Sequence, residues 1–188
     1  KIMSEIKTFT PVKLICGVIF SEKVIREKAR DILLEKFGQI DLQSDAFPFN
    51  FSHYYEQEMG QNLKRYFLSF QSLIAPEQLP ALKHQTNQIE KDFKLFFPGL
   101  NLIRPVNLDP GYLKASALIM ATTKDFAHRI PLSGGIYAHL ELLLSKDKVR
   151  TLDWTYPDFY QPGYQQFFLA VRKIYLDQLR KLRAERTP

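Results

Sequence analysis

Cysteine is almost absent from this sequence. Its 188 residues include one cysteine, Cys16, so no disulfide can form within the chain. Cys16 lies inside an apolar run over residues 12–20, where an unpaired thiol is expected to pack as a small hydrophobic group. The fold must therefore depend on its own hydrophobic core, and a chain of this length is long enough to bury one.

Long apolar segments are lacking as well. No stretch approaches the roughly 20 apolar residues that a membrane-spanning helix needs. The N-terminal residues do not contain the apolar segment of a secretory signal peptide. We therefore expect a cytoplasmic protein that does not enter a membrane.

The sequence contains none of the short motifs that identify the commonest catalytic and nucleotide-binding sites. It lacks the phosphate-binding loop G-x-x-x-x-G-K-[ST], the dinucleotide motif G-x-G-x-x-G, the C-x-x-C pair and the nucleophile elbow G-x-S-x-G. A thiol protease is also disfavoured, because Cys16 falls in a predicted buried strand and not at an exposed, activated position.

The residues that are present describe a globular protein. Hydrophobic residues make up 45% of the chain and aromatic residues 13%, which excludes a disordered chain and predicts a core rich in Phe and Tyr. We predict a single domain over residues 11–184, with flexible termini at 1–10 and 185–188.

The formal net charge is +6, and much of the excess lies near the C-terminus. Such a basic segment can contact nucleic acid or an acidic partner. The alternative is a solvated helix face that ends in a frayed tail. The basic residues concerned are Arg172, Lys173, Arg180, Lys181, Arg183 and Arg186.

Hydrophobic periodicity predicts an α+β fold. The order of elements is strand, helix, strand, strand, helix, strand, which is the order of the ferredoxin-like β-α-β-β-α-β motif. We predict that motif as the core. Its strands are expected at residues 12–20, 39–49, from 66 and 102–108, and its helices at residues 22–37 and from about 76.

The C-terminal half predicts additions to this core. Residues 110–121 can form a short helix, because Asp109 is a good N-cap and Pro110 suits a first turn, or they can form a strand. The remaining segments predict a β-hairpin or meander over residues 128–132, 136–144 and 148–153, and a C-terminal helix from Pro162.

One polar cluster lies around the fourth predicted strand. Asn107 and Asp109 would point to the same face of a strand, with Arg104 close by. Two oxygen ligands beside an arginine can hold Mg²⁺ and a phosphate, so Asp109 is a candidate catalytic residue and metal ligand, and Asn107 a candidate metal ligand. The alternative is that Asp109 caps the following helix while Asn107 satisfies loop backbone.

A second cluster contains Lys124, His128 and Arg129. Two cations and a titratable imidazole could bind phosphate and transfer a proton, which makes His128 a candidate catalytic residue. The alternative is a turn followed by the exposed start of a strand. Two further histidines, His84 and His139, have no evident partner in the sequence, and structural or surface roles are expected for both.

The second predicted helix carries a polar stripe. Lys83, Asn87, Glu90 and Lys94 recur at helical spacing on one side of it. Exposure to solvent is the default expectation for such a stripe. Asn87 and Glu90 are the two members that we consider as ligand-binding residues.

The segment between the second and third strands is long and aromatic. Loops of this length are often functional, and Tyr54 and Tyr55 are candidates for a lid that stacks on a ligand. His53, Glu56 and Glu58 in the same segment form only a weak metal-binding pattern, since the loop supplies a single histidine.

Several longer strings resemble a family of bacterial proteins catalogued only as a domain of unknown function. The resemblance covers nearly the whole chain after residue 10 and implies no particular activity. The strings that carry it are residues 107–112 (NLDPGY), 124–130 (KDFAHRI), 135–137 (GIY) and 154–158 (WTYPD), together with 47–49 (FPF) and 54–56 (YYE).

A fainter similarity, over about residues 12–109, is to hydroxymethylpterin pyrophosphokinase. That family is ferredoxin-like and transfers pyrophosphate from ATP with two Mg²⁺ ions. Arg104, Asn107 and Asp109 have the spacing of its arginine and metal-binding aspartates, and Asn87 and Glu90 match its polar helix positions. Asn107 stands where an aspartate is expected, however, and the Gly-Ser-Asn segment after the first strand is missing.

These observations support two hypotheses. The first is a protein that binds a phosphate-bearing small molecule, such as a nucleotide, with Mg²⁺-dependent phosphoryl or pyrophosphoryl transfer. It predicts that Asp109 and either His128 or Arg129 line one cavity, with Tyr54 or Tyr55 near its mouth. The second is a non-enzymatic module that binds nucleic acid or an acidic partner through its basic C-terminal helix. The sequence leaves the oligomeric state open.

Overall fold

The computed structural model describes residues 5–51 and 55–185, which form one antiparallel sheet and four α-helices. The strands are β1 (Val12–Phe20), β2 (Ile40–Gln43), β3 (Phe47–Pro48), β4 (Lys64–Ile74), β5 (Val106–Lys114), β6 (Ala117–Thr122), β7 (Ile130–Pro131), β8 (Tyr137–Leu144) and β9 (Val149–Arg150). The helices are α1 (Lys23–Phe37), α2 (Glu56–Met59), α3 (Leu79–Phe93) and α4 (Pro162–Glu185), with short 3₁₀ turns at Pro76–Gln78, Lys94–Phe96 and Pro157–Tyr160. The predicted mixed α and β fold with a C-terminal helix is confirmed.

The main path of the sheet runs β2-β4-β1-β5-β6-β8-β7, with β3 paired to β4 and β9 to β8. Strand β1 lies near the middle, paired antiparallel with β4 on one side and β5 on the other. All nine of its residues are buried, which explains why its sequence is almost continuously apolar. None of the helices in the described part of the chain is long and apolar enough to cross a membrane.

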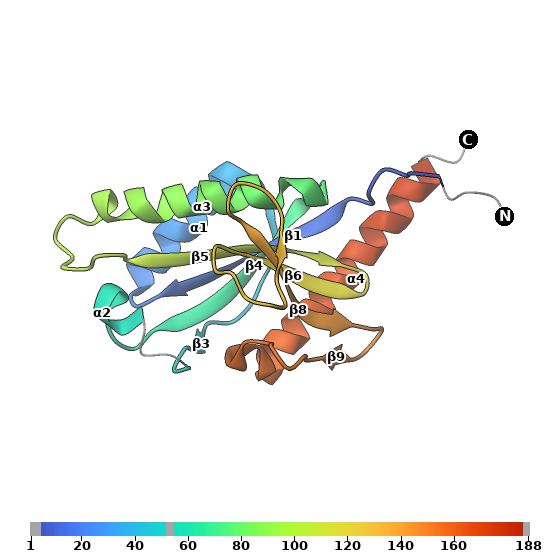
Figure 1. Ribbon diagram of the computed structural model, residues 1–188. Coiled ribbons are helices and arrows are strands. Elements are labelled where there is room, and N and C mark those ends of the chain that lie inside the picture. The colour runs from blue at the N-terminus through green and yellow to red at the C-terminus, as the bar shows by residue number, and fades with distance from the viewer. Residues whose placement is uncertain (1–4, 52–54, 186–188) are drawn as a thin grey trace.

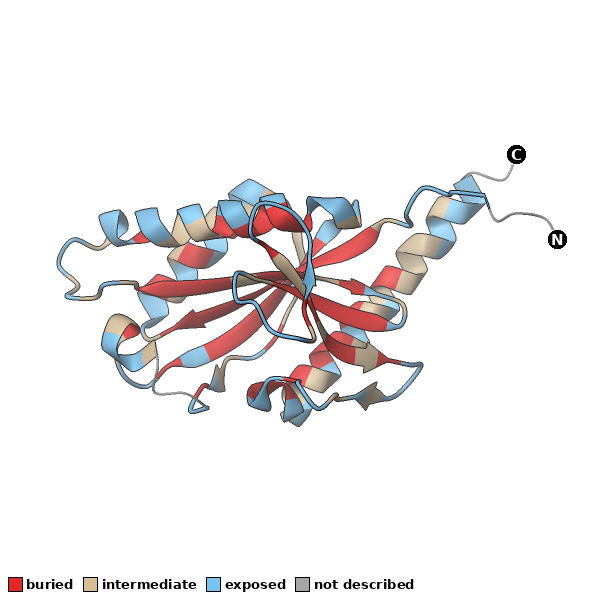
Figure 2. Ribbon diagram, in the orientation of Figure 1, coloured by how far each residue is buried: buried red, intermediate tan, exposed pale blue. Residues whose placement is uncertain are grey.

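Helices cover both faces of the sheet, with α1 and α3 on one face and α4 on the other (Figure 1). Alternate residues of β1 serve the two layers, since Cys16 packs with α1 and α3 while Ile15 packs with α4. Figure 2 shows the resulting burial along the strands. The α4 layer is the aromatic one and centres on Phe67, whose ring contacts four other aromatic rings.

The structure corrects several predicted boundaries. Residues 110–121 form no helix. Instead, β5 continues to Lys114 and turns directly into β6, because β6 pairs with β5 from Gly111 onward. Asp109 therefore cannot cap a helix. The predicted strand at 39–49 shortens to the four residues of β2 and the two of β3, and those at 128–132 and 148–153 each shorten to two residues.

Strands β5 and β6 are paired only at one end. Their ladder joins Gly111–Lys114 to Ala117–Met120, whereas β5 before Gly111 pairs with β1 alone and β6 after Met120 pairs with β8 alone. The two strands part at residues before Gly111 on β5 and after Met120 on β6, and the sheet opens between them there. A cavity lies in this opening.

Cys16 gives a direct test of the core. Its side chain is fully buried, and this burial raises the pKa of the thiol above its usual range. We expect no reaction with an aromatic disulfide reagent in the native state, because the thiolate is the reactive form, and reaction of one thiol per chain in denaturant. Rapid labelling of the native protein, measured by absorbance, would contradict this packing.

Candidate functional site

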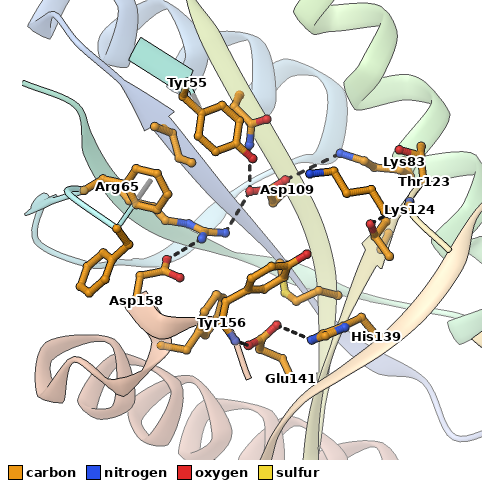
Figure 3. A pocket seen from close by; sticks show the side chains of 18 of the residues that line it. Tyr55, Arg65, Lys83, Asp109, Thr123, Lys124, His139, Glu141, Tyr156 and Asp158 are labelled. Atoms are coloured by element: carbon orange, nitrogen blue, oxygen red, sulfur yellow. Dashed lines mark hydrogen bonds and ion pairs between the residues drawn. The ribbon is translucent and has the colours of Figure 1, made fainter. Parts of the chain in front are cut away.

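A cavity of about 560 Å³ opens where β5 and β6 part (Figure 3). Its walls come from α2, α3, β4, β5, β6 and β8 and from the 3₁₀ turn that precedes α4. Segments far apart in the sequence therefore meet around it. A cavity of this volume can hold a ligand the size of a nucleotide.

Asp109 lines the cavity, and the side chains labelled in Figure 3 surround it. Its Oδ2 atom accepts hydrogen bonds from Nη2 of Arg65 at 3.0 Å and from Nδ2 of Asn107 at 2.8 Å. Its Oδ1 atom is 3.8 Å from the ammonium nitrogen of Lys83. The Asp109 side chain is still 25% exposed, so the carboxylate remains accessible from the cavity.

Arg65, on β4, is a buried cation that joins two carboxylates. Nη1 donates to Asp158 at 2.6 Å and Nη2 donates to Asp109 at 3.0 Å. The guanidinium carbon lies 5.0 Å from the ring centres of both Phe67 and Phe159. Burial alone would lower the pKa of Arg65, but Asp158 and Asp109 raise it above its usual value, so the group is a permanent cation.

Gly17 allows Arg65 to reach Asp109. The two residues lie on β4 and β5, with β1 between them, and Gly17 is the β1 residue paired with Asp109. A Cβ atom at Gly17 would lie 2.9 Å from Nη2 of Arg65 and 3.0 Å from Cε1 of Phe67. A larger residue at this position would therefore push against the arginine that crosses β1.

Side chains of α3 bond to β5 in the region where β6 does not pair with it. The Lys83 ammonium donates to the Leu108 carbonyl at 3.0 Å, and Oε1 of Glu90 accepts from the Leu108 N–H at 2.6 Å. Both backbone groups of Leu108 are thereby satisfied on the side of β5 where β6 does not pair with it. Burial raises the pKa of Glu90, and Lys83 and the Leu108 N–H offset this only in part. The expectation that this stripe faces solvent is wrong for Lys83, which is buried.

Arg104 forms one wall of the cavity. Its Nε lies 3.1 Å from Oε2 of Glu58, and Nη1 donates to Oε2 of Glu90 at 3.4 Å and to Oδ1 of Asn107 at 3.0 Å. Its guanidinium carbon is 5.2 Å from the ring centre of Tyr55. The predicted proximity of Arg104, Asn107 and Asp109 is thus present in the structure.

Arg129 holds the segment that brings Lys124 to the cavity. The Arg129 side chain is buried and donates to the Lys124 carbonyl at 2.8 Å and to the Tyr156 hydroxyl at 2.6 Å. Lys124 lines the cavity, and Figure 3 shows its side chain directed toward Asp109. Arg129 is not among the lining residues and therefore acts on the site by positioning other groups.

The two histidines of this region lie in different surroundings. His139 lines the cavity, accepts a hydrogen bond at Nδ1 from Nε of Arg129, and places Nε2 2.9 Å from Oε2 of Glu141. His128 is not a lining residue; its ring stacks on Trp154 with 5.2 Å between the ring centres. The structure therefore brings Lys124 to Asp109. It places His128 outside the cavity lining, with its ring centre 5.1 Å from that of His139.

The remaining candidate residues are placed as follows. Asn87 and Glu90 line the cavity, and so does Tyr55, whose ring points toward Asp109 (Figure 3). Burial, followed by the Asp109 charge, raises the pKa of the Tyr55 hydroxyl. Tyr54 lies outside the described residues.

The residues around Asp109 do not fit a magnesium ion. Oδ1 of Asn107 already accepts from Arg104, and Oδ2 of Asp109 accepts two N–H groups. The Lys83 ammonium near Oδ1 of Asp109 would repel a divalent cation. Within residues 5–51 and 55–185, no group of three or more His, Cys, Asp or Glu could hold a metal ion. We therefore derive no step through a metal.

Six cavity residues that bear on function were not among the candidates from the sequence: Arg65, Lys83, His139, Glu141, Tyr156 and Asp158. A signal existed for Arg65 and Glu141, because Arg65 adjoins the apolar run Tyr66–Leu68 and Glu141 lies between two leucines, where a charged residue is unusual. His139 and Glu141 also share one face of β8, since they are two residues apart. Asp158 was noted only as the end of a family string.

The fold and cavity define an α+β protein with an ion-pair-rich cavity in a split antiparallel sheet. The chain belongs to the family described as a domain of unknown function (DUF4416), which matches residues 10–175. The family resemblance seen in the sequence is thereby confirmed. No curated protein and no solved structure matches the chain, so the similarity to hydroxymethylpterin pyrophosphokinase stays a prediction.

Proposed function

We propose that this protein binds a phosphate-bearing small molecule of nucleotide size in the cavity between β5 and β6. The observation that carries this proposal is the meeting of four cationic side chains from four parts of the chain. Arg65 comes from β4, Lys83 from α3, Arg104 from the segment before β5 and Lys124 from the segment after β6. Lysine and arginine side chains that converge in this way are the usual protein partners of phosphate oxygens.

The carboxylates of the cavity favour a nucleotide over a bare phosphate. Asp109 and Asp158 share Arg65, and Glu58 and Glu90 share Arg104, so a ligand meets acceptors as well as cations. Ribose hydroxyl groups are donors that suit such acceptors, and carboxylates bind them in other nucleotide sites.

Aromatic rings supply surface for a base. Tyr55 and Tyr156 both line the cavity, and each presents a flat ring with a polar hydroxyl. Tyr156 is held by the hydrogen bond from Arg129 to its hydroxyl. We propose that one of these rings stacks on the base.

We further propose that the core is ferredoxin-like. Strand β4 lies between β1 and β2, and β1 lies between β4 and β5, which supports a split β-α-β arrangement. Phosphoryl or pyrophosphoryl transfer with Mg²⁺ stays a prediction, and the surroundings of Asp109 do not favour it.

Thermal unfolding with added ligands tests the proposal. A ligand that binds only the native state raises the melting temperature, with roughly 2.7 kcal/mol of stabilisation at 100 times its Kd. We expect AMP and ATP to raise the melting temperature without Mg²⁺, and inorganic phosphate to raise it less. No shift with any purine or pyrimidine nucleotide at millimolar concentration would overturn the proposal.

Lys124→Ala tests how much the Lys124 ammonium contributes to ligand binding. Because Lys124 is exposed, its removal should leave the melting temperature nearly unchanged. We expect about a tenfold loss of AMP affinity in calorimetric titration, since a charge-assisted hydrogen bond to phosphate is lost. Lys146→Ala removes an equally exposed lysine from the β8–β9 turn and should leave AMP affinity unchanged.

Asp109→Asn separates metal-free binding from metal-dependent binding. If the cations hold the phosphate directly, removing this negative charge should raise AMP affinity about two- to tenfold without Mg²⁺, by reducing repulsion. If Asp109 instead held Mg²⁺ for the phosphate, the same substitution should abolish Mg²⁺-dependent binding. Titration of both proteins with and without Mg²⁺ distinguishes the two results.

A second candidate function rests on α4. Its last turns extend beyond the sheet (Figure 1) and carry exposed Arg180 and Lys181. We propose contact with nucleic acid or an acidic partner as the alternative. Such binding should weaken steeply with salt and disappear when residues after Leu179 are removed. The meeting of Lys124 with Arg104 and Asp109 in one cavity supports the first proposal over this one.

A further inference from the structure

A second hollow, of about 670 Å³, lies along α3 beside the cavity. Four residues line both spaces: Glu58, Asn87, Glu90 and Arg104. The two hollows therefore share a wall, which is built largely by the Arg104 side chain and the two carboxylates that hold it.

The second hollow has an excess of positive charge. Its acidic residues, Glu58 and Glu90, are both within ion-pair distance of Arg104. Lys91 and Lys94 also line it, and neither forms an ion pair within the described part of the chain. An anion placed there would meet two ammonium groups that are not engaged in ion pairs with any described residue.

Arg104 retains hydrogen-bonding capacity at the shared wall. Its Nε faces Glu58, and its Nη1 donates to Glu90 and Asn107. Within residues 5–51 and 55–185, Nη2 has no such partner, and the side chain is 24% exposed. A phosphate passing between the hollows could therefore accept from Nη2 while the rest of the guanidinium stays fixed.

The spacing along α3 favours an elongated anion as the ligand of both hollows. Lys83 and Lys91 are eight residues apart, which is about 12 Å along an α-helix. The Lys83 ammonium is held at the first cavity by the Leu108 carbonyl and by Asp109, so a phosphate bound to it lies apart from Lys91 and Lys94. A chain of phosphates suits this interval better than one phosphate group does.

We infer that the second hollow is an anion subsite of the same ligand site, and that the ligand class is a nucleoside polyphosphate. The first phosphate lies near Lys83 and Lys124, and the later phosphates pass Arg104 to reach Lys91 and Lys94. This inference rests on the proposed function, since it extends the ligand bound in the first cavity.

Titration with AMP and ATP tests the inference. The native protein is expected to bind ATP about tenfold more tightly than AMP. Lys91→Ala/Lys94→Ala should remove that difference, lowering ATP affinity about tenfold while AMP affinity stays the same. Lys173→Ala/Lys181→Ala, which removes two exposed lysines from α4, is the control for the change in net charge and should alter neither affinity.

The outcomes separate the two proposals. Unchanged affinity for both nucleotides in Lys91→Ala/Lys94→Ala would overturn the subsite but leave AMP binding in the first cavity intact. Equal weakening of AMP and ATP would also overturn it, because the lysines would then act through the general field. If the native protein bound neither nucleotide, the proposed function would fail and this inference with it.

Discussion

Arg65→Met is expected to lower the free energy of unfolding by about 3–5 kcal/mol, the usual result of removing one partner of a buried ion pair. Asp158 is almost fully buried and would lose its 2.6 Å bond from Nη1, leaving a carboxylate without a cation in a nonpolar setting. Asp109 would lose one of its two hydrogen bonds to Oδ2 as well. Urea unfolding followed by circular dichroism measures the loss.

A double substitution separates this charge effect from lost packing. Arg65→Met/Asp158→Asn leaves no ionised carboxylate unpaired at position 158, so it should recover part of the stability lost in Arg65→Met. Arg30→Met is the matched control, because Arg30 is 44% exposed and 3.8 Å from Asp31. It should change stability by less than about 0.5 kcal/mol. An Arg65→Met protein as stable as the Arg30→Met protein would contradict the assigned role of Arg65.

Part of the fold follows from local sequence patterns. The apolar run at 12–20 and the helical periodicity at 22–37 correspond to β1 and α1, and the in-phase apolar residues after Pro162 correspond to α4. These elements bury one continuous face or are buried throughout, so their periods are strong. Short strands such as β7 and β9 have no comparable period, which is why their bounds were predicted too long.

The helix alternative for residues 110–121 failed because a local signal was outweighed by pairing. Asp109 followed by Pro110 resembles a helix start, yet Pro110 lies immediately before the β5–β6 ladder begins at Gly111. A residue without an N–H is tolerated there. Sequence reasoning about caps cannot detect a hairpin partner that lies further along the chain.

The candidate site was predicted in its sequence-local part only. Arg104, Asn107 and Asp109 lie within six residues, so strand alternation sufficed to place them together. Arg65 reaches Asp109 because β4 and β5 flank β1 and because Gly17 has no side chain. Neither condition can be read from spacing, since strand order is a property of the whole sheet.

The polar stripe of α3 illustrates the same limit. A stripe off the apolar face is normally solvated, and Lys94 is exposed as expected. Lys83 and Glu90 are drawn inward because the backbone of Leu108 has no β6 partner to bond with. The split of the sheet therefore creates both the cavity and the need for the charged groups that line it.

Gly111→Ala is expected to lower the free energy of unfolding by about 2–3 kcal/mol and to disturb the cavity. Gly111 pairs with Met120 at the last rung before β5 and β6 part. A Cβ atom there would lie 2.6 Å from the Ile119 carbonyl oxygen and 2.6 Å from Sδ of Met120. The thioether can move, but the carbonyl belongs to the β6 backbone, so relief requires the strands to separate.

Gly99→Ala is the matched control for this substitution. A Cβ atom at Gly99 meets nothing within 4 Å, so the same added methyl group should change stability by less than about 0.5 kcal/mol. Separation of the strands at Gly111 would move Asp109 on β5 away from Lys124, which follows β6. AMP affinity should therefore fall in Gly111→Ala and stay level in Gly99→Ala. Denaturant unfolding and calorimetric titration measure the two effects independently, and a Gly111→Ala protein that matches Gly99→Ala in both would show that the last rung does not determine where the sheet opens.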